Sequence, residues 1–582
     1  MDQKNLILAI ALSVAILLGF QVLFPQHRQA TQTPAPTPAA QQQAATPQAA
    51  GGNGSVPAAP TAAPAVPREV PRLRIEGTRV TGSISLLGAR IDDIRLNDFH
   101  ETIDRTSPNV HVLTDFTSPH PYWAQFGWTA PQGVAVPDNN TVWTASAPAL
   151  RQDTPVTLSW DNGAGLRFEQ ELTLEPDFLI KVEQRVVNTT GAPVALTPWG
   201  RVRREYSPQT EGFYILHEGL VGVIDGRLQE FTYGKTRDEG AKRNGVAFEA
   251  SSVGGWAGFT DKYWLSALIP DQQAVSSKTS FRHVQIAGQD QFQVDVLQPD
   301  TPPLAAGATL SGTFHLFAGA KEVRVLDHVR DTLGVQDFDK AVDFGWFYFL
   351  TKPFFYVIDW LFHLTGNFGI AILIFTLIVK LLFFPLANKS YKSMSKMKLL
   401  APKMQELKER YAGDSAKIQQ EMMALYRTEK VNPAAGCLPM LIQIPVFFSL
   451  YKVLFVTIEM RHAPFFGWIR DLSAPDPTNV FNLFGLIPFD PTAHLSLLHL
   501  GVWPLIMGLT MFLQQRLNPT PPDPIQAKVF AFMPLIFTFM LARFPAGLVI
   551  YWTWNNLLSI GQQWLIMRQT ATTKPGKAVA KA

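Results

Sequence analysis

The chain has 582 residues, of which 47% are hydrophobic and 17% are charged, the latter well below the roughly 25% typical of soluble domains. Its 50 Lys and Arg against 47 Asp and Glu leave a net charge of +3, which argues against a dedicated nucleic-acid-binding protein. The single cysteine, Cys437, excludes intramolecular disulfides and any metal site built on several cysteines. Nearly all the long apolar runs lie at the N-terminal tip and after residue 343, so these parts are expected to lie in a membrane.

The N-terminal part predicts a membrane anchor followed by a tether. Residues 5–24 carry no charge, and a helix of about 20 residues spans about 30 Å, the thickness of a bilayer core. An uncleaved anchor is favoured over a signal peptide because no small-residue cleavage motif follows closely, although the Ala-rich stretch beyond leaves cleavage open. Residues 29–67 contain no charged residue and consist mostly of Ala, Pro, Gln and Thr, which predicts an extended tether.

The next region, residues 68–337, predicts a large all-β sandwich. Apolar and polar residues alternate as they do in half-buried strands, and long helical periodicity is absent. The loop Asp161-Asn162-Gly163-Ala164-Gly165 joins two such segments and predicts a hairpin. The predicted strands include 73–75, 84–86, 156–160, 166–174, 284–286, 292–297 and 309–317.

The remaining chain predicts a bundle of membrane spans. Residues 338–363 are rich in aromatic residues but are interrupted by Lys352, Pro353 and Asp359, which favours an amphipathic helix lying along the membrane surface. With the N-terminal anchor, the uncharged windows that follow make six spans. These windows are 364–379 (continuing past Lys380 to 388), 431–451, 500–515, 529–542 and 544–567.

The distribution of basic residues predicts the orientation of the chain. If the N-terminus is cytoplasmic, the inner segments hold 17 Lys and Arg and the short outer loops hold four. Because Lys and Arg accumulate on the cytoplasmic side, both termini are expected there, and the β-sandwich outside, in the periplasm of a Gram-negative cell. The chain is therefore expected to be a multi-pass protein of the bacterial inner membrane.

Residues 388–432 predict an antiparallel helical hairpin in the cytoplasm. Apolar residues recur at helical spacing on both sides of Gly413-Asp414-Ser415, which supplies a turn and an N-cap. One interpretation is that this apolar stripe only holds the two helices together. The other is that the methionines bind nascent apolar segments or a targeting receptor, because methionine adapts to varied partners. The candidate methionines are Met397, Met404, Met422 and Met423, with Met394 nearby, and Pro402 is expected to kink or restart the first helix.

Lys380 is the most informative single residue. An ionised side chain in the middle of a membrane costs roughly 2.5–3.5 kcal/mol, so such residues are rare and usually functional. Snorkelling to the headgroups is the simpler explanation, but the basic belt begins only at Lys389, about 13 Å further along a helix. A hydrated cavity inside the membrane region is therefore favoured. Polar residues on the spans that could line it are Thr376, Gln443, Gln514, Thr538, Asn555, Asn556, Gln562 and Gln563, although each could instead hold helices together.

Sequence motifs of bond-making enzymes are absent. Gly234-Lys235-Thr236 resembles the end of a phosphate-binding loop, but Gln229 stands where the upstream glycine is required. His217-Glu218 lacks the second histidine of a zinc protease. We therefore expect a protein that is not an enzyme, hydrolyses no ATP and needs no cofactor or metal.

Several stretches resemble the YidC/Oxa/Albino family of membrane protein insertases, and within it the Gram-negative bacterial type. The matching stretches are NPAAGCLPMLIQIP (432–445), SKMKLLAPKMQELKERY (395–411), QQEMMALYR (419–427), DLSAPDP (471–477) and FPAGLVIYW (544–552). These matches are dense and specific, and they cover roughly residues 343–568. The anchor, the tether and the β region match the family layout more loosely.

The resemblance implies a five-helix core with a hydrophilic groove open to the cytoplasm and to lipid. Lys380 matches the groove cation, which is Arg in most relatives, and Thr376 matches a groove residue one turn earlier. Tyr551 and Trp552 match an aromatic pair that touches substrate, with Trp552 in place of a second Tyr. The family's β domain resembles a sugar-binding supersandwich, but nothing in this sequence supports sugar chemistry.

The implied function is ATP-independent insertion and folding of membrane proteins. The implied partners are nascent membrane proteins, the Sec translocon and membrane lipids, and possible further ones are the ribosome and the signal-recognition-particle receptor; no specific nucleic acid is implied. Two alternatives are a polytopic transporter, which usually shows internal repeats that this chain lacks, and an envelope-assembly factor with a carbohydrate-binding domain. The expected division is an anchor (1–24), a disordered linker (25–67), the periplasmic β-sandwich (68–337), an interfacial helix (338–363), the second span (364–387), the cytoplasmic hairpin (388–432), four further spans (433–568) and a basic cytoplasmic tail (569–582).

Overall fold

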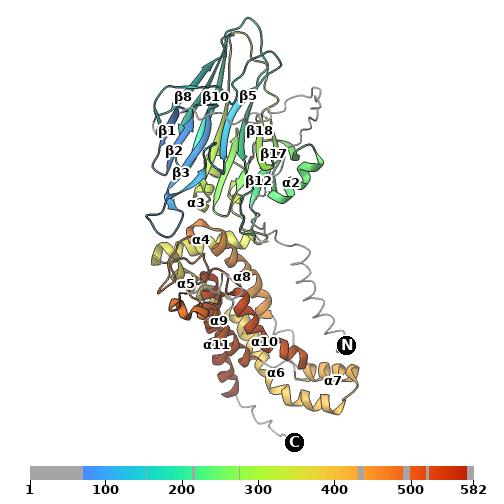
Figure 1. Cartoon of the computed structure of the whole chain (residues 1–582). Coiled ribbons are helices and arrows are strands. Elements are labelled where there is room, and N and C mark those ends of the chain that lie inside the picture. Colours follow the sequence, from blue (N-terminus) through green and yellow to red (C-terminus); the bar gives the residue numbers. More distant parts are fainter. Residues whose placement is uncertain are drawn as a thin grey trace, which may run out of the picture. The chain divides into compact units, whose positions relative to one another are not determined.

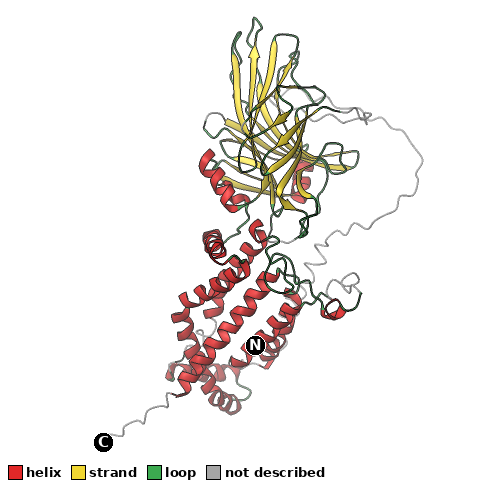
Figure 2. Ribbon diagram, turned by 90° about the vertical axis from the view of Figure 1, so that its left-hand side faces the viewer, coloured by secondary structure: helices red, strands yellow, loops and turns green. Residues whose placement is uncertain are grey.

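The computed structural model describes most of the chain after residue 69. The described residues are 70–152, 154–212, 216–273, 276–429, 431, 438–488, 499–518 and 524–572. The predicted N-terminal anchor, the linker, the basic tail after residue 572 and Cys437 lie outside them. Strands occupy one part of the described chain and the long helices another (Figures 1 and 2).

The β part consists of two sheets that pack face to face, which confirms the predicted sandwich. The ten-stranded sheet has the order β14-β17-β18-β11-β5-β3-β2-β1-β7, with β4 paired to β3, and the nine-stranded sheet has the order β13-β12-β15-β16-β19-β10-β9-β8-β6. The strands of the first sheet are β1 (Arg72–Glu76), β2 (Val80–Ser85), β3 (Arg90–His100), β4 (Asn109–Leu113), β5 (Tyr122–Thr129), β7 (Ala149–Leu150), β11 (Thr197–Arg204), β14 (Val246–Val253), β17 (Ser276–Ile286) and β18 (Gln289–Leu297). Those of the second are β6 (Thr144–Ala145), β8 (Val156–Asp161), β9 (Leu166–Leu174), β10 (Leu179–Asn188), β12 (Gly219–Ile224), β13 (Arg227–Thr232), β15 (Trp256–Thr260), β16 (Trp264–Pro270) and β19 (Thr309–Ala320).

Alternating side chains fill the space between the two sheets. Along β9, every second residue from Leu166 to Leu174 is buried, as period-two patterning requires. Aromatic rings from the two sheets meet in the core, where Phe126 of β5 lies 5.8 Å from Phe314 of β19 between ring centroids. The hairpin predicted between β8 and β9 is present, and Gly163 in its loop has a φ of 69°, which glycine adopts without steric cost.

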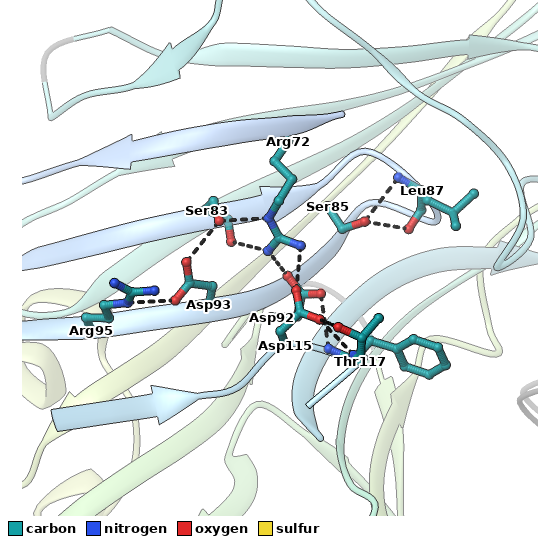
Figure 3. A network of polar contacts seen from close by, with 10 residues as sticks. Arg72, Ser83, Ser85, Leu87, Asp92, Asp93, Arg95, Asp115 and Thr117 are labelled. Carbon is teal, nitrogen blue, oxygen red and sulfur yellow. Dashed lines mark hydrogen bonds and ion pairs between the residues drawn. The ribbon is translucent and has the colours of Figure 1, made fainter. Parts of the chain in front are cut away.

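The outer face of the ten-stranded sheet carries a network of ion pairs (Figure 3). Arg72 Nε donates to Ser83 Oγ at 2.8 Å, and its guanidinium pairs with Asp92 and, at 2.8 Å, with Asp115. Ser83 Oγ donates in turn to Asp93 at 3.0 Å. These side chains point toward one another and join β1, β2 and β3 to the loop after β4. The network is therefore assigned a structural role.

Two helices in the β region were not predicted. Helix α2 (Tyr233–Lys242) begins at Thr232, whose side chain caps the Lys235 N–H, and α3 (Val323–Leu333) ends at Gly334 with a left-handed φ of 65°. Both are short, so neither produces the long periodicity on which the all-β prediction relied. The missed signals are the capping Thr232 and the C-terminal Gly334, which are typical helix boundaries.

The second part of the chain is helical. It comprises the 3-10 turn η1 (Phe338–Ala341), α4 (Tyr348–Thr365), α5 (Phe368–Leu382), α6 (Phe384–Arg410), α7 (Ser415–Thr428), α8 (Leu438–Val456), η3 (Ile458–Met460), η4 (Val480–Gly485), α9 (Val502–Leu517), α10 (Pro524–Leu541) and α11 (Ala546–Thr572). By length and composition alone, no single described helix suffices to cross a bilayer, whereas α5 and α6, which meet at a bend of 68°, are together long and apolar enough to be a candidate span.

The bend separates Lys380 from the basic residues that follow. A continuous helix was expected to residue 387, but α5 ends at Leu382 and α6 begins at Phe384. Pro385 stands in the first turn of α6. Because proline has no N–H to donate and is tolerated in the first turn, it fits the start of a new helix better than the continuation of the old one. In contrast, α6 runs through Pro402 without a restart, which excludes one of the two outcomes expected at this proline; the kink stays a prediction.

Candidate functional site

Lys380 lies in the last turn of α5 and points to α11. Its Nζ donates to Ser559 Oγ at 2.7 Å, and the Ser559 hydroxyl donates to the Asn555 carbonyl oxygen at 2.7 Å on its own helix. Lys380 is half-buried, while Ser559 is buried. Two segments 179 residues apart in the sequence therefore place a cation and a hydroxyl in contact.

A polar stripe on α11 faces two other helices. The stripe consists of Tyr551, Asn555 and Ser559, which lie on one face because they are four residues apart. Gln443 of α8 donates its side-chain N–H to the Tyr551 hydroxyl at one end of the stripe, and Lys380 of α5 contacts Ser559 at the other. The structure thus brings together four of the predicted groove residues and adds Ser559.

A second set of polar contacts joins α11 to the α9 segment. Asn556 Nδ2 donates to Thr510 Oγ1 of α9 at 3.1 Å, and Gln563 Nε2 donates to Asn518 Oδ1 at 2.9 Å. Asn556, Thr510 and Gln563 are buried, so these bonds satisfy polar groups inside the helix packing. This set holds α11 and α9 together, whereas the polar stripe faces α5 and α8.

Two predicted groove residues bond within their own helices. Thr376 is buried and donates to the Ile372 carbonyl oxygen at 2.7 Å, and Thr538 of α10 donates to the Pro534 carbonyl oxygen at 2.7 Å. Thr538 packs against Gly508 of α9. These contacts link Thr538 to α9 and not to the set around Lys380.

Trp552 joins an aromatic cluster next to the polar stripe. Its ring lies 4.7 Å from Phe447 of α8 and 5.7 Å from Phe537 of α10, between centroids. Trp552 is half-buried, and its neighbour Tyr551 is buried. The aromatic pair of α11 therefore divides its contacts: Tyr551 bonds to Gln443, and Trp552 packs between α8 and α10.

The methionines of the hairpin take two kinds of position. Met397, Met404 and Met422 pack with the residues that hold α6 against α7, where the Tyr426 hydroxyl donates to Met404 Sδ at 3.6 Å. Met423 is 46% exposed. The expected N-cap is present, because Asp414 accepts from the Lys417 N–H at 3.0 Å. Most of the methionine stripe thus lies between the helices.

Ser559 and Thr510 are site residues that the sequence analysis did not select. Serine and threonine are common within apolar helices, where they usually bond to their own backbone, so neither residue type draws attention. A signal existed for Ser559, because it continues the four-residue spacing of Tyr551 and Asn555. No comparable signal identifies Thr510, since its partner lies 46 residues away in the sequence.

The electrostatic setting of Lys380 differs from that of Arg201 and Lys352, each of which pairs with a carboxylate, and is similar to that of buried Lys321, whose Nζ donates to Thr260 Oγ1 at 2.8 Å. Arg201 pairs with Asp295 at 2.7 Å, and Lys352 pairs with Asp327 at 2.7 Å. Within the described part of the chain, no carboxylate lies within 4.0 Å of the Lys380 ammonium. The described residues also contain no cluster of three His, Cys, Asp or Glu that could hold a metal ion. The site offers a cation, hydroxyls and amides, which suit hydrogen bonding and charge pairing.

Two family models match adjacent parts of the chain. Residues 72–357 match the model described as the YidC periplasmic domain, and residues 360–574 match the model described as 60Kd inner membrane protein. The membrane protein insertase YidC of Granulibacter bethesdensis is 58% identical over 581 residues, which cover 99% of each chain. That of a Methylobacterium species is 49% identical and covers 98% of this chain and 95% of the relative.

Solved structures show weaker similarity. A structure described as an active YidC insertase with its first transmembrane domain resolved is 18% identical and covers 85% of this chain and 92% of its own, with a TM-score of 0.35. The assignment therefore rests on the family models and the sequence relatives. The family models and the relatives define a class of inner membrane insertases that carry a periplasmic domain. Proteins of this class are not enzymes. The chain belongs to the YidC family of membrane protein insertases.

Proposed function

We propose that Lys380 and the polar stripe of α11 receive the hydrophilic segment of an incoming membrane protein. The observation that carries this proposal is the Lys380 ammonium, which contacts the neutral Ser559 hydroxyl and, among the described residues, no carboxylate. An acidic or carbonyl-rich segment would supply the missing acceptors. At an effective dielectric constant of about 20, a carboxylate about 4 Å away would gain about 4 kcal/mol of attraction.

The rest of the insertion step follows from transfer free energies. A hydrophilic segment held at the stripe avoids contact with hydrocarbon, while the apolar segment behind it leaves between the helices into lipid. Each Leu-like residue gains about 0.3–0.6 kcal/mol on entering the bilayer core, so a span of about 20 residues needs no nucleotide. In this scheme Thr376, Gln443, Tyr551 and Asn555 keep the path polar, and Trp552 and Thr538 border it.

The proposed topology puts α5 and α8–α11 across the inner membrane, with the β-sandwich in the periplasm and both termini in the cytoplasm. The excess of Lys and Arg in the predicted inner segments supports this orientation. Trp360 of α4 and Trp346, which lies just before this helix, are exposed, and Asp359 of α4 pairs with Arg324. Exposed tryptophans beside charged residues suit a helix at the membrane surface. The α6–α7 hairpin would then face the cytoplasm, where exposed Met423 and Leu399 offer an apolar contact to a ribosome or targeting receptor. Cooperation with the Sec translocon belongs to the same proposal.

The test is insertion of a small single-span substrate into proteoliposomes that contain only the full chain. With a substrate that carries an acidic tail, Lys380→Glu should lower the insertion rate at least about tenfold, equivalent to about 1.4 kcal/mol, and Lys380→Arg should preserve it. Reversing the tail charge to lysine should restore insertion by Lys380→Glu. Ser559→Ala is the matched control, because it removes the hydroxyl partner but keeps the charge.

Two results would contradict the electrostatic role of Lys380. One is equal insertion by the Glu and Arg variants. The other is an equal loss with acidic and neutral tails, which would indicate a folding defect; thermal unfolding of each purified variant provides the control. Photo-crosslinkers at Thr376 and Trp552 should label the substrate tail during insertion if the path runs along α5 and α11.

A further inference from the structure

The connection between α8 and α9 exposes a turn of apolar side chains. The turn, residues 481–487, is here called the apolar turn. Its large side chains are solvent-exposed, and the sequence from Pro477 to Phe489 contains no charged residue. The exposed fractions are 44% for Phe481, 52% for Leu483, 54% for Phe484, 83% for Leu486 and 44% for Ile487. Single exposed apolar residues are ordinary, but a contiguous group of this size marks a contact surface.

The apolar turn is fastened to the start of α9. The Val480 N–H donates to the Leu500 carbonyl oxygen at 2.9 Å, and the Val502 N–H donates to Thr478 Oγ1 at 3.0 Å. The Trp503 N–H donates to Asp476 Oδ2 at 2.9 Å. These bonds fix the residues just before the turn beside the first turn of α9. The apolar turn therefore has a defined position next to that helix end.

The backbone of the apolar turn adopts a conformation that is sterically unfavourable for the residues present. Leu483 has φ 49° and ψ 48°, and Phe484 has φ 59° and ψ 32°, so two successive bulky residues are left-handed. Glycine or asparagine would adopt these angles at lower steric cost. The conformation is held by the Phe484 N–H, which donates to the Asn479 carbonyl oxygen at 2.8 Å. Strained residues that also expose apolar surface point to a contact outside the chain.

We propose that the apolar turn inserts into the outer leaflet of the membrane and anchors the α8–α9 connection there. This proposal rests on the proposed function, which places α8 and α9 across the membrane. Three observations favour lipid as the occupant. The residues just before the turn are bonded to the start of α9, and further along this helix the apolar side chains of Leu505, Ile506 and Leu509, which are 38%, 37% and 58% exposed, would meet acyl chains.

The second observation is the lack of charge in the turn, where Asn482 is the one polar side chain among large apolar ones, which suits acyl chains better than a specific protein surface. The third is Trp468, which is 43% exposed and whose indole N–H donates to Asp476 Oδ1 at 3.0 Å, the residue that fastens the turn to α9. Tryptophan with a bonded N–H and an exposed ring is typical of the membrane interface. The anchored connection would hold the outer ends of α8 and α9 at a fixed depth.

The experiment places one fluorescent label at a time in full-length protein in proteoliposomes. In a Cys437→Ala background, Leu486→Cys carries an environment-sensitive fluorophore, and the vesicles contain phosphatidylcholine brominated near the headgroup or deep in the acyl chains. Leu509→Cys on α9 is the control for contact with lipid. Val253→Cys on β14, which is 65% exposed, is the control for an exposed apolar residue in water.

We expect shallow bromolipid to quench the Leu486 label at least about twofold and more than deep bromolipid does, while the Val253 label stays unchanged. If the Leu509 label is quenched and the Leu486 label is not, the apolar turn does not enter lipid, although the helices do. If neither is quenched, the proposed membrane placement itself fails. The proposal of a lipid contact would also be overturned if bromolipid does not quench the fluorophore at Leu486→Cys and a photo-crosslinker at the same position captures a second protein.

A substitution in the turn provides a second test. The double variant Leu483→Asn with Phe484→Gly removes two apolar side chains. Because asparagine and glycine adopt left-handed angles readily, the fold of the turn should survive. Quenching of the Leu486 label by shallow bromolipid should fall at least about twofold in this variant. Unchanged quenching would show that these two residues do not anchor the turn.

Discussion

The buried pair of Arg201 and Asp295 allows a quantitative prediction for the β-sandwich. Arg201 Nε donates to Asp295 Oδ1 at 2.7 Å, and the two side chains are only 2% and 1% exposed. Asp295→Asn keeps the size of the side chain but removes the charge that compensates the guanidinium. Breaking a buried pair in this way costs about 3–5 kcal/mol because the remaining charge stays desolvated.

This loss converts into a shift in melting temperature. With an unfolding entropy of about 2.1 cal/mol/K per residue over a domain of roughly 260 residues, the expected decrease is about 5–9 °C. The assay is thermal unfolding of the full chain in detergent, followed by near-ultraviolet circular dichroism of the tryptophans. Glu239→Gln is the matched control, because its partner Lys242 lies in an exposed pair at 2.8 Å; we expect no measurable shift.

A double variant separates charge from packing. Arg201→Met with Asp295→Leu should recover part of the stability, since replacing a buried pair by apolar residues is often neutral, while Arg282 loses its 3.3 Å contact with Asp295. If Asp295→Asn melts at the same temperature as the Glu239→Gln control, the buried pair does not carry the predicted energy. If the double variant is as unstable as Asp295→Asn, the loss reflects packing rather than an uncompensated charge.

Two further predictions concern helix packing and pH. A Cβ at Gly508 would overlap Thr538 Oγ1, so Gly508→Ala should destabilise the α9–α10 pair by about 1–3 kcal/mol, and Thr538→Ala in the same chain should restore the melting temperature; additive losses would show that the two residues do not touch. Burial lowers the pKa of His217 from 6.5 to about 4, so between these pH values the unfolded chain binds a proton at His217 and the folded state does not. Stability should therefore fall by up to about 3 kcal/mol as pH drops from about 6.5 to about 4, and His217→Gln should remove that part of the decrease; identical pH profiles would contradict the assignment.

The sequence identified the kinds of element better than it identified their ends. Strands β8 and β9 were predictable because their apolar residues alternate and a glycine-containing loop joins them. The break between α5 and α6 was missed, since hydropathy averages over a window and Pro385 lies within an apolar run. Helices α2 and α3 were missed because each is too short to show a long period.

The candidate site was partly predictable. Lys380 stands out in any reading of the sequence, because a charge within an apolar segment is costly. Its partner Ser559 does not, since a serine in a helix is ordinary and 179 residues separate the two. The division of the polar residues into a stripe facing α5 and α8 and a set facing α9 depends on how α11 is rotated, which hydropathy does not specify.

Composition and local pattern by themselves determined that this chain has a β part, a helical membrane part and a cation in an apolar segment. These properties depend on neighbouring residues and on the free energy of moving each side chain between water and hydrocarbon, which sequence order records directly. The tertiary structure decided which polar groups meet, which methionines are covered between α6 and α7, and which apolar residues remain exposed beside α9. Those features depend on contacts between residues far apart in the chain, and packing alone brings such residues together.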